Sequence, residues 1–142
     1  MTASPHLSVV VPVFNERDNV TPLIDEIVAA LRGLTSFEIV YVDDCSRDDT
    51  LDVLKRLKSD VPELRVIKHI SQSGQSTAIR TGVKQAHGAW IATLDGDGQN
   101  DPADIPGMVN LLLQSRQTEE VRMIAGMRAK RLDSRWRLIS SR

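Results

Sequence analysis

The sequence has little of what secreted and membrane-spanning proteins need. It contains one cysteine, Cys45, so no disulfide can form within the chain, which is consistent with a reducing compartment. Residues 1–6 carry no basic leader of the signal-peptide type. No apolar run approaches the ~20 residues that span a bilayer. We therefore expect a soluble, cytoplasmic chain.

Two phosphate-binding motifs are also missing. No Gly-x-Gly-x-x-Gly follows a predicted strand and no Gly-x-x-x-x-Gly-Lys-Ser/Thr loop occurs, which disfavours dinucleotide oxidoreductases and P-loop NTPases. Internal repeats, linkers and low-complexity segments are absent as well. The 142 residues, 41% of them hydrophobic, suffice for one domain, which we place at residues 1–142.

Charge is distributed unevenly along the chain. The net charge is only −1, but the last 15 residues are strongly basic and the rest of the chain is acidic. The basic residues of this tail are Arg128, Lys130, Arg131, Arg135, Arg137 and Arg142, against Asp133 alone. A basic tail on an acidic body indicates an anionic partner at that end, although a solvated terminal helix would show the same pattern.

Hydrophobic periodicity predicts strands and helices in alternation. Strands are expected at Leu7–Val13, Phe37–Asp43, Leu64–Ile70, Ala89–Leu94 and Val121–Ala125. Helices are expected from an Asp18 or Asn19 cap to Gly33, around Leu51, Leu54 and Leu57, from Gly74 to Ala86, and after Asp101-Pro102. The alternation predicts an α/β fold, with an open, mostly parallel sheet and helices on both faces.

The prediction of a functional site starts from residues 89–102. Ala89–Leu94 has almost no polar side chain, which is typical of a strand buried on both faces, and Asp95-Gly96-Asp97-Gly98 follows it. If the strand continued, both carboxylates would leave the same side, about 7 Å apart. The glycines would leave room for a large ligand. The pattern suits Mg²⁺ shared with a phosphate group.

Other acidic sites fit this stretch less well. An EF-hand calcium loop would need Glu where Pro106 stands. A phosphatase with an aspartyl nucleophile would want a hydroxyl residue where Gln99 stands. A phosphorelay receiver would place an Asp after the third strand, where residues 69–71 read His-Ile-Ser.

Polar residues recur where the predicted parallel strands end. They occupy residues 12–16, 43–46 and 95–97, and ligands of such sheets bind beyond the carboxyl ends of the strands. Together they predict a metal–phosphate site. Each has a simpler alternative: a turn for Asp43-Asp44, a helix cap for Ser46 or Asp48, and neutralisation of a helix N-terminus for Glu16.

Three segments resemble the signature blocks of family 2 glycosyltransferases, which have the GT-A fold. They are residues 9–16 (VVVPVFNE), 42–50 (VDDCSRDDT) and 94–99 (LDGDGQ). The Asn-Asp-Pro and Ile-Pro that follow resemble the dolichol-phosphate mannose synthase branch, which includes bacterial undecaprenyl-phosphate sugar transferases. The family commonly has Gly at the positions of Cys45 and Asp49. The chain is shorter than a usual catalytic domain of this family, so we expect the N-terminal part of a longer protein.

The resemblance implies roles for individual residues. Those expected to bind the nucleotide are Pro12, Phe14 and Glu16 at the base and ribose, Asp44 on the base side, and Asp95. Those expected to act in catalysis are Asp95 and Asp97, which would hold Mg²⁺ or Mn²⁺ against the donor diphosphate, and Gln99 at the reaction centre. Those expected to bind the acceptor phosphate are Arg128, Arg131 and Arg137.

The expected function is inverting, metal-dependent transfer of a sugar from a UDP- or GDP-sugar to a polyprenyl phosphate. A lipid phosphate is already an anion at neutral pH, so arginines can take the place of a general base. The basic tail would bring the protein to the cytoplasmic face of the membrane. No nucleic-acid partner is expected. Transfer to a saccharide or other hydroxyl, and a non-catalytic nucleotide-sugar-binding module, are the alternatives.

Overall fold

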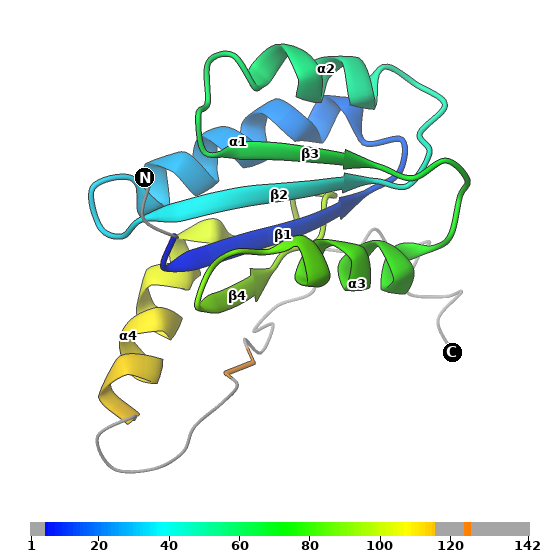
Figure 1. Cartoon of the computed structure of the whole chain (residues 1–142). Helices are drawn as coiled ribbons and strands as arrows, with labels where there is room; N and C mark the ends of the chain where they lie inside the picture. Colours follow the sequence, from blue (N-terminus) through cyan, green and yellow to red (C-terminus); the bar gives the residue numbers. More distant parts are fainter. Residues whose placement is uncertain (1–4, 116–123, 126–142) are drawn as a thin grey trace, which may run out of the picture. The chain divides into compact units, whose positions relative to one another are not determined.

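The computed structural model describes residues 5–115 and 124–125, and its contacts divide the chain into two units, residues 1–106 and 107–142. The strands of the first unit are β1 (Leu7–Val13), β2 (Phe37–Asp43), β3 (Leu64–Lys68) and β4 (Trp90–Thr93). Its helices are α1 (Arg17–Leu31), α2 (Thr50–Leu57), α3 (Gln75–Gln85) and the short 3₁₀ helix η1 (Pro102–Asp104). Helix α4 (Ile105–Ser115) begins at the boundary between the units (Figure 1).

The four strands form one parallel sheet in the order β3-β2-β1-β4. Every residue of β1 and β2 is buried, as expected for central strands of a parallel sheet. All four strands point the same way, so their carboxyl ends meet at one edge of the sheet (Figure 1). We call this the carboxyl edge and the opposite one the amino edge.

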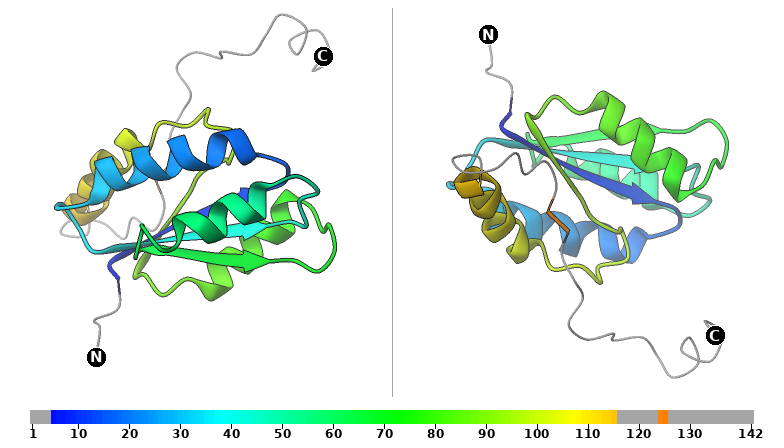
Figure 2. Two further views of the ribbon diagram at one scale, coloured as in Figure 1. Left: turned by 90° about the horizontal axis from the view of Figure 1, so that it is seen from above. Right: turned by 90° about the horizontal axis from the view of Figure 1, so that it is seen from below.

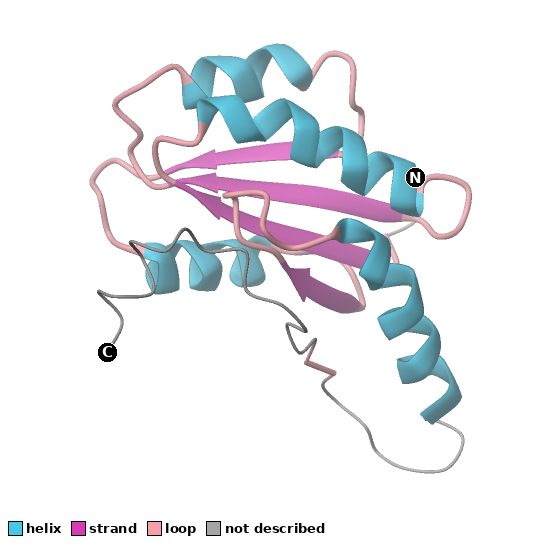
Figure 3. Ribbon diagram, turned by 180° about the vertical axis from the view of Figure 1, so that it is seen from behind, coloured by secondary structure: helices cyan, strands magenta, loops and turns pink. Residues whose placement is uncertain are grey.

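Helices cover both faces of the sheet. Helices α1 and α2 lie on one face, and α3 lies on the other, against β1 and β2 (Figures 2 and 3). The buried residues of α1 form one apolar stripe: Val20, Leu23, Ile24, Ile27 and Leu31. Val28, expected from the sequence on the same stripe, is half-buried. Helix α3 packs closely on the sheet, because a Cβ on Gly82 would lie 2.4 Å from Val10 Cγ1.

Two predicted boundaries are wrong. Helix α1 begins at Arg17, with Glu16 as its N-cap residue, so Asp18 and Asn19 lie in the first turn instead of capping it. Strand β3 ends at Lys68 and not at Ile70, because Lys68 pairs with Asp43, the last residue of β2. The predicted end of α1 is confirmed: Gly33 follows the C-cap with φ +88°, a conformation that glycine adopts without strain.

Strand β4 differs more from the prediction. It is not buried on both faces, since Ile91 is 42% exposed, and among the described residues it pairs with β1 alone. It also ends at Thr93, so Asp95 and Asp97 lie in a turn and not along a strand. Of the predicted fifth strand, residues 121–123 lie outside the described residues, and residues 124–125 form no strand. In the part of the chain that the structure describes, no helix has the length and apolarity needed to cross a bilayer.

Candidate functional site

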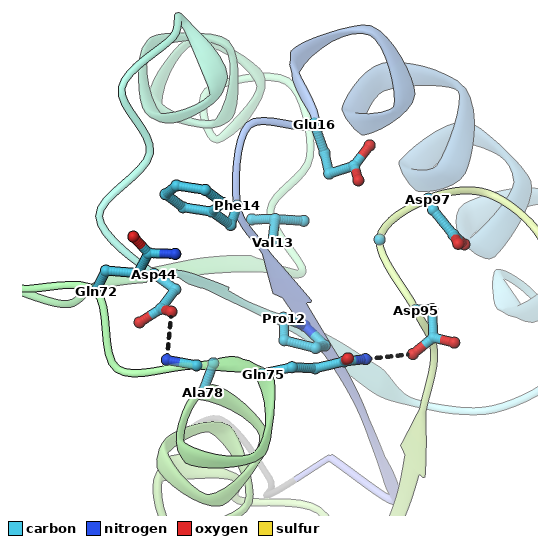
Figure 4. A pocket seen from close by; sticks show the side chains of 12 residues that line it. Pro12, Val13, Phe14, Glu16, Asp44, Gln72, Gln75, Ala78, Asp95 and Asp97 are labelled. Carbon is cyan, nitrogen blue, oxygen red and sulfur yellow. Dashed lines mark hydrogen bonds between the residues drawn. The ribbon is translucent and has the colours of Figure 1, made fainter. Parts of the chain in front are cut away.

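A cleft of about 360 Å³ opens at the carboxyl edge of the sheet (Figure 4). Its walls come from the segments that follow β1, β2, β3 and β4, all within the first unit. The lining residues are Pro12, Val13, Phe14, Glu16, Asp44, Gln72, Gly74, Gln75, Ala78, Asp95, Gly96 and Asp97. Every nucleotide-binding and metal-binding residue expected from the sequence is in this set, so the structure brings the three acidic clusters together.

The segment after β1 is held by the segment after β2. Asn15, which has a left-handed backbone (φ +54°), donates its N–H to Ser46 Oγ at 2.9 Å and accepts from Arg47 N–H at 2.8 Å through its side chain. Glu16 donates its N–H to Thr50 Oγ1 at 2.9 Å. Phe14 and Glu16, on either side of Asn15, are thereby fixed at the mouth of the cleft.

The adjacent carboxylates of Asp43 and Asp44 have different environments. Asp43 is fully buried, does not line the cleft and accepts the Ser46 N–H at 3.3 Å, as the turn alternative predicts. Asp44 lines the cleft and binds His69 Nδ1 at 2.7 Å, Ser73 N at 2.8 Å and Gly74 N at 2.7 Å. Asp44 is therefore an anchor for the β3–α3 loop as well as a lining residue of the cleft.

The hydrogen bonds of Asp44 decide its ionisation. Burial would raise the pKa of this carboxyl, but donation from His69 and from the two backbone N–H groups outweighs burial, so the pKa lies below its usual value. His69 is fixed in turn, because its Nε2 lies 2.8 Å from Thr81 Oγ1 on α3. The carboxylate is therefore ionised at neutral pH and held rigidly.

The Asp-Gly-Asp segment has its own supports. Gln75 Nε2 donates to Asp95 Oδ1 at 2.8 Å, and the Asp95 N–H donates to Asn100 Oδ1 at 3.3 Å. Asp97 is exposed and accepts the Gln99 N–H at 3.0 Å. Gln99, expected at the reaction centre, does not line the cleft, but its backbone N–H contacts Asp97.

The glycines of this segment are explained by the protein itself. A Cβ on Gly96 would lie 2.4 Å from Val13 Cγ1 and 2.8 Å from the Pro12 carbonyl oxygen, so the approach of β1 excludes any side chain there. Gly98 has φ +74°, which glycine tolerates best. The expectation that Gly96 makes room for a ligand is therefore replaced by a packing requirement at the end of β1.

The cleft carries four carboxylates, and none of its lining residues is Lys, Arg or His. With Asp44 committed to the loop, Asp95 and Asp97 are the pair suited to a cation. No group of three or more His, Cys, Asp or Glu suited to a metal occurs among the described residues. Two carboxylates fit Mg²⁺ or Mn²⁺, whose remaining positions water and phosphate oxygens would fill.

His69, Gln72 and Gln75 are part of the site or its support but were not predicted from the sequence. The polar run from His69 to Gln75 follows β3, whose end lies at the same edge as those of β1, β2 and β4, and this was the available signal. Of the predicted acceptor-phosphate residues, Arg128, Arg131 and Arg137 all lie outside the described residues. Cys45 does not line the cleft.

The chain resembles known proteins along most of its length. A family model described as glycosyl transferase family 2 matches residues 8–131. The chain is 39% identical over 132 residues to the dodecaprenyl-phosphate galacturonate synthase of Rhizobium johnstonii, covering 92% of this chain and 38% of that protein. It is 40% identical over 134 residues to the undecaprenyl-phosphate 4-deoxy-4-formamido-L-arabinose transferase of Pseudomonas syringae pv. syringae, with the same coverage of 92% and 38%.

Solved structures share the fold. S. aureus TarS 1–349 in complex with UDP-GlcNAc is 26% identical with a TM-score of 0.68, covering 78% of this chain and 32% of that one. The mannosyltransferase PcManGT from Pyrobaculum calidifontis, in complex with GDP-Man and Mn²⁺, is 25% identical with a TM-score of 0.68, covering 78% and 33%. The predicted GT-A fold is confirmed. This chain spans 38% of the length of the two curated relatives described above.

Proposed function

Because the chain belongs to glycosyltransferase family 2, we propose that it forms the donor-binding part of an enzyme that transfers a sugar from a nucleoside-diphosphate sugar to a polyprenyl phosphate. The observation that carries the proposal is the cleft itself, whose carboxylates are gathered from three strand ends with no basic residue among the residues that line it. The acceptor class is supported by the names of the two relatives, both of which act on polyprenyl phosphates.

The donor nucleotide would occupy the cleft between the segments after β1 and β3. Pro12 and Phe14 offer apolar surface to a base, and Glu16 offers carboxylate oxygens to ribose hydroxyls. Asp44 lies on the far wall from Asp97, consistent with a base at one end of the cleft and a diphosphate at the other (Figure 4). Uracil and guanine donors both remain in this proposal, because TarS binds UDP-GlcNAc and PcManGT binds GDP-Man.

The diphosphate would bind where Asp95 and Asp97 stand. An anionic group cannot approach carboxylates without a cation between them, so these two residues would hold Mg²⁺ or Mn²⁺. When bound, that ion neutralises charge growing on the departing nucleoside diphosphate. Asp97 is held for this by the backbone N–H of Gln99, and Asp95 by the side chain of Gln75.

The acceptor phosphate would bind the basic tail. Arg128, Arg131 and Arg137 offer guanidinium groups, which bind phosphate oxygens in pairs. A phosphate anion attacks without first losing a proton, so the reaction would need no general base. A single displacement, in which the acceptor oxygen bonds to the anomeric carbon as the nucleoside diphosphate leaves from the opposite side, would invert that carbon. The same tail would hold the protein at the anionic cytoplasmic face of the membrane, at about 1 kcal/mol per basic residue near the surface.

The test is a transfer assay with the protein that carries this chain at its natural length. UDP- and GDP-sugars would be supplied with Mn²⁺, with undecaprenyl phosphate or undecaprenol as acceptor, followed by chromatography of the lipid product. We expect lipid-linked sugar with the phosphate alone, and none in EDTA. Transfer to the alcohol or to a saccharide, with none to the phosphate, would contradict the proposed acceptor.

A further inference from the structure

Gln75, the first residue of α3, reaches across the cleft to the Asp-Gly-Asp segment. Its Nε2 donates to Asp95 Oδ1 at 2.8 Å, and the two residues are 20 positions apart in the sequence (Figure 4). Among the described cleft-lining residues, this side-chain contact joins the β3–α3 wall to the segment after β4. The contact fixes one oxygen of the carboxylate best placed for a cation.

The position of Gln75 depends on Asp44, the residue that follows β2. The α3 N-cap, Gly74, has no side chain to satisfy the N–H groups of the first turn, and its φ is +90°. Asp44 instead fixes the two residues immediately before the first turn, because its two oxygens accept the N–H groups of Ser73 and Gly74 at 2.8 and 2.7 Å. A carboxylate 30 residues away thus holds the start of α3 and, with it, the residue that contacts Asp95.

Asp44 is itself held in place by His69. His69 Nδ1 donates to the same oxygen, Oδ1, that accepts Ser73, and His69 also contacts Thr81 in the second turn of α3. The side chain of Asp44 is 5% exposed and that of His69 is 13% exposed, so water competes little for these contacts. The contacts therefore run without a break from Thr81 through His69, Asp44 and Gly74 to Gln75 and Asp95.

We propose that Gln75 is a positioning residue for Asp95, and that Asp44 acts through it to join the base side of the cleft to its diphosphate side. A carboxylate free to rotate loses that freedom when it binds a cation, whereas the amide of Gln75 has already fixed the Asp95 plane. The inference rests on the proposed function, since it assigns the partner of Asp95 within the same site. Gln75 need not touch the ligand for this role.

The test compares Gln75→Met, which keeps side-chain length and helix propensity but removes the amide, with Gln85→Met at the exposed last residue of the same helix. Two titrations are made on the 142-residue chain: Mn²⁺ alone, followed by electron paramagnetic resonance, and UDP or GDP by calorimetry, with Mn²⁺ and with EDTA. We expect Gln75→Met to weaken Mn²⁺ binding and Mn²⁺-dependent nucleotide binding about tenfold. Nucleotide affinity in EDTA and the melting temperature should stay at the wild-type values.

The outcomes separate the inference from the proposed function. Equal Mn²⁺ affinity in Gln75→Met and Gln85→Met would overturn the positioning role. A loss of nucleotide affinity of the same size in EDTA would also overturn it, because it would show general damage to the cleft. Wild-type chain that binds Mn²⁺ but no nucleotide would overturn the proposed function alone, since the Mn²⁺ titration still decides on Gln75. Binding of neither would overturn both.

Discussion

The two edges of the sheet bury acidic side chains in opposite ways. At the amino edge Glu38, which is 6% exposed, accepts the Ser8 hydroxyl at 2.6 Å, the His87 N–H at 2.6 Å and Arg65 at 2.7 Å. Burial would raise the pKa of this carboxyl, but those donors outweigh it and lower the pKa. The charge and the hydrogen-bonding capacity of Glu38 are therefore satisfied by groups of the protein itself, without a ligand.

The carboxyl edge lacks that balance. Its cleft gathers Glu16, Asp44, Asp95 and Asp97 with no basic side chain among its lining residues, and Asp97 is exposed. Carboxylates gathered in one cleft repel one another unless a cation lies between them, so this edge is suited to a cation in a way that the amino edge is not. The comparison indicates that Glu38 is a structural acid whose partners all come from the fold, whereas Asp97 is exposed and open to a ligand.

The largest expected effect comes from breaking the amino edge. Glu38→Ala leaves Arg65, the Ser8 hydroxyl and the His87 N–H without their acceptor, and should lower the free energy of unfolding by about 3 kcal/mol. Urea denaturation measures it. The control is Glu63→Ala, which breaks an ion pair with Arg32 whose side chain is 52% exposed, and should cost less than about 1 kcal/mol. Equal losses would show that burial at the amino edge does not matter.

Acid should weaken the same network by a smaller amount. The folded-state pKa of Glu38 lies below the ordinary value of 4.5, so its stabilisation is present above that value and is lost as the pH falls through the lower, folded pKa. Unfolding free energies measured from pH 6 downward should therefore fall more steeply in wild type than in Glu38→Gln. Parallel pH profiles would mean that Glu38 titrates alike in both states.

At the carboxyl edge the same kind of change should affect binding in place of stability. Asp97→Ala should weaken Mn²⁺-dependent binding of UDP or GDP at least tenfold, roughly 1.4 kcal/mol, because half of the carboxylate pair is lost. The melting temperature should stay level or rise, since repulsion is relieved. Calorimetry with Mn²⁺ and with EDTA makes the measurement. Wild-type affinity that is equal in the two buffers would rule out the metal.

A glycine substitution at the carboxyl edge should relieve backbone strain. Cys45 has a left-handed backbone (φ +65°) at a position where the resembling family commonly has glycine. Cys45→Gly should raise the unfolding free energy by about 1 kcal/mol, with nucleotide binding retained. Asn15→Gly is the matched control: Asn15 is also left-handed, but its side chain accepts the Arg47 N–H, so the gain should be cancelled. A destabilised Cys45→Gly variant would contradict the argument.

The smallest effect concerns a polar group between the two edges. The Tyr41 hydroxyl in the middle of β2 is fully buried and has no hydrogen-bond partner within the described part of the chain, and burial raises its pKa. Tyr41→Phe removes that unpaired group and should stabilise the protein by up to about 1 kcal/mol. Thermal melts would detect the gain. A loss of stability would reveal a partner for the hydroxyl.

Local patterns predicted most of the framework. Runs of β-branched residues gave β1 and β2 at their observed bounds, and the three-to-four-residue spacing of apolar residues gave the buried stripe of α1. Alternation of strands and helices is enough to make the sheet parallel, and a parallel sheet places its strand ends at one edge. The meeting of Glu16, Asp44, Asp95 and Asp97 therefore followed from the sequence.

Tertiary structure alone decided what each carboxylate does. Asp43 and Asp44 are neighbours with the same chemistry, yet Asp43 closes a turn while Asp44 binds His69 and the start of α3, 25 to 30 residues away. Gly96 is required by β1, more than 80 positions earlier, and Gln75 finds Asp95 across the cleft. Periodicity governs the conformation of neighbouring residues, whereas the donors that a carboxylate finds depend on how distant segments pack, which no local pattern contains.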